Sequence, residues 1–131
     1  MKHDEFARYN FNLAPNIRQA EWRIVVLFYA AVHAANHVLF GGELKRGEYS
    51  HSQRTLALES HAELRKKASP YRELRKLSEQ ARYHPWVMPM LQSQADRAQV
   101  LAEDFLLFCK VIVKKQSEPP KAQAAEAKGK T

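Results

Sequence analysis

The chain has 131 residues, of which 45% are hydrophobic and 27% charged, and this balance predicts one soluble globular domain. A single cysteine excludes an internal disulfide, the opening residues MKHDEFARYN lack the apolar core of a signal peptide, and we expect no stretch able to cross a bilayer, so a cytoplasmic location follows. The net charge of +7 favours anionic partners such as nucleic acid or nucleotides.

The first long helix is expected between Asn16 and Phe40, after a lead-in of residues 1–15. Apolar residues recur there at helical spacing, Pro15 suits a first helical turn, and Gly41–Gly42 is typical of a helix C-terminus. The run IVVLFYAAV is rich in β-branched residues and could form a strand. Its length and its alanine-rich continuation favour a buried helix instead.

A second helix is predicted over about 51–68, after the polar residues 43–50. Ser50 or Ser52 can supply its N-terminal cap, because a serine hydroxyl accepts a hydrogen bond from a free amide of the first turn. Ser69–Pro70 is expected to end this helix.

Two further helices complete the expected fold. The third begins at Pro70 and stops at His84–Pro85, and the fourth covers roughly 90–115 with an apolar stripe along one side. Residues 116–131 are basic and poor in apolar side chains, so we expect a disordered tail. The sequence therefore predicts an all-α bundle of four to five helices over residues 16–115.

Two histidines, His33 and His37, stand four residues apart in the first long helix and could face a metal together. A zinc-protease motif would need a glutamate at Ala34, and no third ligand is evident, since Cys109 lies in the apolar stretch FLLFCKVIV. We therefore expect no metal and no cofactor, and His33 is interpreted as a buried, hydrogen-bonded side chain.

The pair Arg54 and His61 is the strongest candidate for chemistry. Seven residues are close to two helical turns, so in a helix over 51–68 both side chains would point the same way, about 10 Å apart along the axis. His51 and Arg65 fall near the same face. An arginine can bind a scissile phosphate while a histidine moves the proton of an RNA 2′-hydroxyl. The alternative is that both are solvated side chains on an exposed helix face.

Three stretches together resemble a bacterial group of HEPN-domain proteins. The similarity covers about residues 20–110 and is carried by WRIVVLFYAAVHAANHVL (22–39), SHSQR (50–54) and YRELRKLSEQARY (71–83). The resemblance implies a helical bundle that is often a homodimer. It also implies either a metal-independent endoribonuclease of toxin–antitoxin or phage-defence systems, or a non-catalytic module that binds a nucleotide, nucleic acid or a partner protein.

The nuclease motif of that family is an arginine, a polar residue and, after a short spacer, a histidine. Arg54, Thr55 and His61 fit it at the long end of its spacing, with threonine in place of the more usual asparagine, aspartate or histidine. The resemblance therefore implies that Arg54 binds the phosphate, that His61 acts as the catalytic acid or base, and that the two motifs of a dimer face each other. A partner protein of the nucleotidyltransferase or antitoxin type is also implied.

A second group of polar residues closes the third helix, at Arg82 and Tyr83. One interpretation is that they line a basic pocket for RNA or a nucleotide together with His51 and His33. The other is structural: Tyr83 packs against the bundle and Arg82 pairs with a carboxylate such as Glu79. The sequence leaves both interpretations open.

Overall fold

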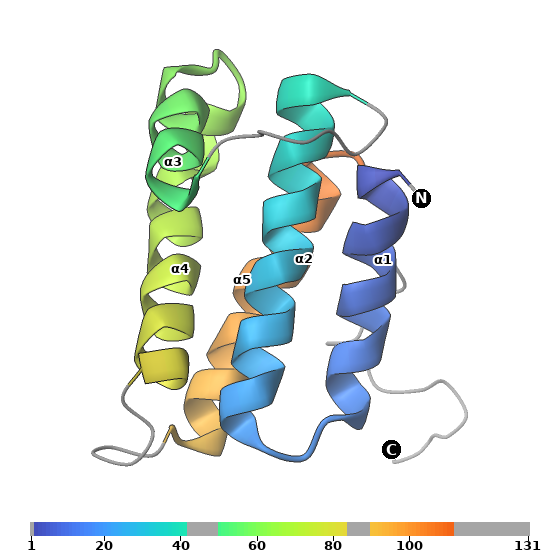
Figure 1. Ribbon diagram of the computed structural model, residues 1–131, viewed down its shortest axis with the longest axis vertical. Coiled ribbons are helices and arrows are strands. Elements are labelled where there is room, and N and C mark those ends of the chain that lie inside the picture. The colour runs from blue at the N-terminus through green and yellow to red at the C-terminus, as the bar shows by residue number, and fades with distance from the viewer. Residues whose placement is uncertain (1, 42–49, 84–89, 112–131) are drawn as a thin grey trace.

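The computed structural model describes residues 2–41, 50–83 and 90–111. Within these ranges it has five α-helices and no strand: α1 (His3–Leu13), α2 (Ala20–Phe40), α3 (His51–Ser60), α4 (Ala68–Tyr83) and α5 (Gln92–Phe108), with 3-10 helices at Ala14–Asn16 and Leu64–Lys67. Helix α2 is central, between α1 and α4 and in front of α5, while the short α3 lies beside α4 (Figure 1). The all-α prediction is confirmed, and the strand alternative for the IVVLFYAAV run is wrong.

Helix α2 supplies much of the core. Large buried side chains come first, at Ile24, Leu27 and Phe28, and alanines such as Ala31 and Ala35 follow them. Alanine lets a neighbouring helix approach closely, and α2 has neighbours on three sides. Surrounding α2 in this way removes its apolar surface from water, which stabilises the bundle.

By length and composition α2 is also apolar enough to cross a membrane, and no other helix of the described ranges is. This corrects the expectation that the chain holds no such stretch. Half of the most apolar 18-residue window of α2 is buried inside the bundle, and both the core helix of a soluble protein and a signal sequence near the N-terminus have this length and composition.

The N-terminal residues are more ordered than expected. Where the sequence suggests only a lead-in, His3–Leu13 forms α1, which packs along α2 (Figure 1). The amide of Lys2 donates to the carboxylate of Glu5 at 2.7 Å, which closes the first turn, and the buried Ala7 and Phe11 face the core.

The predicted second helix is shorter than its pattern indicates. It begins at the expected cap, where the amide of Gln53 donates to the Ser50 hydroxyl at 3.2 Å, but it ends at Ser60 rather than continuing to residue 68. His61 has an extended backbone conformation (φ −78°, ψ 136°). The next α-helix, α4, begins at Ala68, so Pro70 lies within its first turn, where a proline is tolerated.

Helix α5 also ends early, at Phe108 instead of near residue 115. Lys110 adopts a left-handed conformation (φ 65°), and the amides of Lys110 and Val111 donate back to the carbonyls of Leu107 and Leu106 at 3.1 and 2.9 Å. These two bonds form a Schellman motif, which usually has glycine at the left-handed position. The side chain of Val111 is buried, so packing stabilises a turn that no glycine in the sequence predicts. The expected disordered tail lies outside the described residues.

Candidate functional site

A chain of hydrogen bonds joins α2, α3 and α4 through five polar side chains, here called the polar ladder: Asn36, Arg54, His51, Tyr29 and Arg82. Arg54 donates from Nε to Asn36 Oδ1 at 2.8 Å, and its Nη1 lies 3.0 Å from His51 Nδ1. The other ring nitrogen of His51 is 3.4 Å from the Tyr29 hydroxyl, which also accepts from Arg82 Nη1 at 3.0 Å. Three elements are therefore held together by one polar network.

The partners of His51 determine where its proton lies. An arginine can only donate, so Nδ1 of His51 accepts from Arg54 and the ring hydrogen is on Nε2, facing Tyr29. The Tyr29 oxygen thus receives hydrogens from both His51 and Arg82. Its own O–H has no acceptor within the described ranges and can donate to a ligand.

Burial and neighbouring positive charges lower the pKa of His51. Burial lowers its pKa from 6.5, the positive charges of Arg54, Arg82 and Arg75 lower it further, and Glu79 opposes them. Of the described groups that act on this imidazole, three are guanidiniums and one is a carboxylate. The surroundings of His51 are therefore electropositive.

This lowered pKa predicts that acid weakens the fold. Below pH 6.5 His51 of the unfolded chain binds a proton that the folded chain resists, so stability falls as the pH drops toward the lower folded pKa. Urea unfolding of the wild type and of His51→Gln at pH 7.5 and pH 5 measures this effect. We expect the stability difference between the two proteins to shrink at pH 5, and a difference independent of pH would contradict the assignment.

Glu79 is bound by Arg75 and not by Arg82. Arg75 donates to Glu79 Oε2 at 3.2 Å and to the Thr55 hydroxyl at 3.0 Å. Arg82 has no carboxylate partner in the described part of the chain, and its guanidinium lies 4.9 Å from the centre of the Tyr83 ring. Tyr83 itself is 55% exposed, so the interpretation of a packed tyrosine and an Arg82–Glu79 pair is wrong.

The structure separates the environments of Arg54 and His61. Arg54 is only 6% exposed and sits in the polar ladder, whereas His61 follows the end of α3. The Nδ1 atom of His61 accepts from the backbone amides of Glu63 and Leu64 at 3.1 and 3.2 Å. Because α3 ends at Ser60, the two side chains do not share the continuous helix face from which their alignment was predicted.

Two other predicted site residues also lie outside the ladder. The ring of His33 contacts α1: its Nδ1 is 3.0 Å from His3 Nδ1, and it stacks on Phe6 at 4.9 Å. Arg65 is exposed on the 3-10 helix after α3. Across the described ranges, no three histidine, cysteine, aspartate or glutamate side chains are grouped to hold a metal ion.

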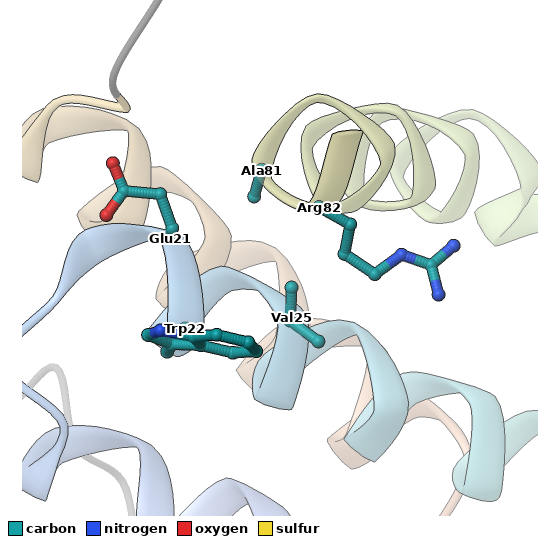
Figure 2. A pocket seen from close by; sticks show the side chains of 5 residues that line it. All are labelled: Glu21, Trp22, Val25, Ala81 and Arg82. Atoms are coloured by element: carbon teal, nitrogen blue, oxygen red, sulfur yellow. The ribbon is translucent and has the colours of Figure 1, made fainter. Parts of the chain in front are cut away.

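The residues missed by the sequence reasoning are on α2. Tyr29 and Asn36 stand seven residues apart in the helix predicted from its apolar spacing, and two polar groups at that interval are a signal for a buried polar network. A cleft of about 390 Å³ adjoins the ladder and is lined by Glu21, Trp22, Val25, Ala81 and Arg82 (Figure 2).

Comparison with known proteins adds no relative. No family model matches the chain, and neither a curated protein nor a solved structure is similar to it. The resemblance to HEPN domains therefore depends on the three sequence stretches alone, and the candidate site depends on its own geometry.

Proposed function

We propose that this protein binds phosphate groups of RNA or of a free nucleotide at the Arg82 end of the polar ladder, without cleaving them. The observation that carries the proposal is the pairing of Arg82 with Tyr29. Arg82 is a half-buried cation with no carboxylate partner in the described ranges, and beside it stands a tyrosine hydroxyl whose hydrogen has no acceptor there. Guanidinium and hydroxyl donors together suit the oxygens of a phosphate.

The ladder orients these donors before a ligand arrives. His51 and Arg82 both donate to the Tyr29 oxygen, which leaves its O–H directed elsewhere. Arg82 is also placed by the aromatic rings of Tyr29 and Tyr83, at 5.9 and 4.9 Å from their centres. A donor held in place loses little conformational entropy on binding, which favours affinity.

Contacts of the two histidines favour binding over cleavage. A general base needs an imidazole nitrogen that is free to take the 2′-hydroxyl proton. Both ring nitrogens of His51 contact ladder residues. Nδ1 of His61 accepts from two backbone amides, so the hydrogen of its neutral ring is on Nε2, which then has no lone pair to take a proton. Cleavage by Arg54 and His61 in a defence or toxin–antitoxin system, as the motif spacing predicts, is the alternative function.

Replacing Arg82 with glutamine is expected to weaken binding of a short mixed-sequence single-stranded RNA at least tenfold, because charge-assisted bonds to phosphate are lost. The salt dependence of the affinity should also become shallower, by about one phosphate contact. Fluorescence anisotropy between 50 and 200 mM salt measures both quantities.

Arg72→Gln is the matched control, since Arg72 is an exposed arginine of the same helix and is paired with Glu59. It removes the same charge and should change the affinity less than twofold. Equal losses in the two variants would show that Arg82 acts only through net charge. RNA from the same mixtures, incubated with EDTA, reports the alternative function: fragments with 2′,3′-cyclic phosphate ends would replace the binding proposal with cleavage.

The remaining parts of the proposal come from the resemblance and from composition. They are a HEPN-like bundle, a homodimer, a partner protein of the nucleotidyltransferase or antitoxin type, and a cytoplasmic location. All five residues of the polar ladder come from one chain, so RNA binding at the ladder does not require a homodimer. Sedimentation of the binding samples distinguishes a 15.1 kDa monomer from a dimer.

A further inference from the structure

A cleft opens beside Arg82, between the first turns of α2 and the last turn of α4. Figure 2 shows Trp22 lying along one wall, with the Glu21 carboxylate and the Arg82 guanidinium directed toward opposite ends. Its volume of about 390 Å³ falls within the range of small-molecule sites. The cleft therefore offers an apolar middle, an acceptor at one end and a cation at the other.

Trp22 is the unusual member of this cleft. Its side chain is 62% exposed, although a tryptophan gains most by being buried. Val25 and Ala81 extend the apolar wall beside it. A flat ring against a small apolar wall is a stacking surface, and nucleobases stack on such rings with little regard to sequence.

Glu21 gives the cleft a preference among bases. Its Oε2 accepts from the backbone amide of Met90 at 3.0 Å, which holds the carboxylate in place. An ionised carboxylate only accepts, so it favours a base edge that presents N–H donors. Guanine offers two adjacent donors, N1–H and the 2-amino group, to two carboxylate oxygens. Uracil offers one N–H between two carbonyl oxygens, which the carboxylate would repel.

We propose that this cleft binds a guanine base, stacked on Trp22 with its N–H edge on Glu21, while the phosphate of the same nucleotide lies on Arg82 and Tyr29. This inference rests on the proposed function, because it takes Arg82 as the phosphate site. The charges are complementary from end to end: the base donates where the cleft has a carboxylate, and the phosphate is anionic where the cleft has a guanidinium.

Fluorescence of Trp22 tests the inference directly. The chain has two tryptophans, so a Trp86→Phe background leaves Trp22 as the reporter. We expect guanosine 5′-monophosphate to quench its emission and to bind at least tenfold more tightly than ribose 5-phosphate, which has the phosphate without the base. Uridine 5′-monophosphate should bind at least fivefold more weakly than the guanosine compound.

Three variants, measured by calorimetry, separate stacking from edge recognition. Trp22→Ala should reduce the affinity for guanosine monophosphate about tenfold, within the range expected for one stacked base, and leave ribose 5-phosphate unchanged. Glu21→Gln should abolish the preference for guanosine over uridine monophosphate. Tyr9→Ala, which removes an aromatic side chain of similar exposure (60%) from α1, should change neither affinity.

The two proposals fail in different ways. The guanine site would be wrong if guanosine monophosphate bound no more tightly than ribose 5-phosphate, or no more tightly than uridine monophosphate. Neither result would contradict phosphate binding at Arg82. If guanosine monophosphate bound but left the emission of Trp22 unchanged, the base would not lie on Trp22 and the inference would be wrong. If ribose 5-phosphate and both nucleotides failed to bind, the proposed function would fall as well.

Discussion

The Arg54→Ala protein is expected to unfold with a free energy about 3 kcal/mol below that of the wild type, because each hydrogen bond made by a charged group contributes about 1.5–3 kcal/mol. Arg54 is 6% exposed and Asn36 is 2% exposed. Removing the guanidinium takes away the donor to Asn36 Oδ1 and the donor to His51 Nδ1. A loss of this size is a large fraction of the typical stability of about 5–15 kcal/mol.

Urea unfolding followed by circular dichroism measures this loss. Arg65→Ala is the control, since Arg65 is exposed and its removal should change the stability by less than about 0.5 kcal/mol. Arg54→Lys should recover only part of the loss, because a single ammonium cannot reproduce the two directed bonds of the guanidinium. A loss below 1 kcal/mol for Arg54→Ala would mean that Asn36 and His51 find other donors. Any effect of Arg54 variants on RNA must therefore be corrected for the folded fraction.

Phe28→Ala is expected to lower the free energy of unfolding by about 4 kcal/mol, the size typical of removing a buried phenylalanine and leaving a cavity. Phe28 is 1% exposed and lies under the polar ladder. Its ring centre is 5.8 Å from that of Tyr71, 5.4 Å from that of His51 and 5.7 Å from that of Tyr29. The substitution removes support from the core and from two ladder residues together.

The same unfolding experiment on Phe28→Leu gives the comparison. Leucine keeps most of the apolar volume, so we expect it to lose less than half as much stability as alanine. RNA affinity, measured well below the unfolding transition, should fall for Phe28→Ala and stay near the wild-type value for Phe28→Leu. Similar losses in both variants would indicate that aromatic contacts, rather than the filled volume, hold His51 and Tyr29 in place.

Features determined by neighbours in the chain could be predicted from the sequence. The helical spacing of apolar residues predicted α2, and Gly41 marks its end, where the backbone has a positive φ of 74°. The Ser50 cap is equally local, since the hydroxyl reaches an amide three residues along. These signals sufficed for the all-α class, because a helix is built from hydrogen bonds between residues close in sequence.

Boundaries set by packing could not be predicted in this way. The pattern that predicts a helix through residue 68 shows no breaker near Ser60, yet α3 ends there. The turn after α5 places Lys110 at a positive φ, and Val111 beside it is buried in the hydrophobic core. The seven-residue spacing of Arg54 and His61 does not place them on one helix face, because α3 ends at Ser60 and residues keep a helical spacing only while the helix continues.

The candidate site shows the same division. The sequence was enough to predict three site residues, His51, Arg54 and Arg82, because charged or titratable side chains in the helices of a basic protein are candidates for binding anions. Which partners they bind on α2 could not be predicted: Asn36 and Arg54 are 18 positions apart, and Tyr29 and Arg82 are 53 apart. Only the tertiary structure decided which polar groups meet, because such contacts depend on how whole helices pack. Helix packing is driven by the burial of apolar surface, which is non-directional and does not specify which polar side chains will pair.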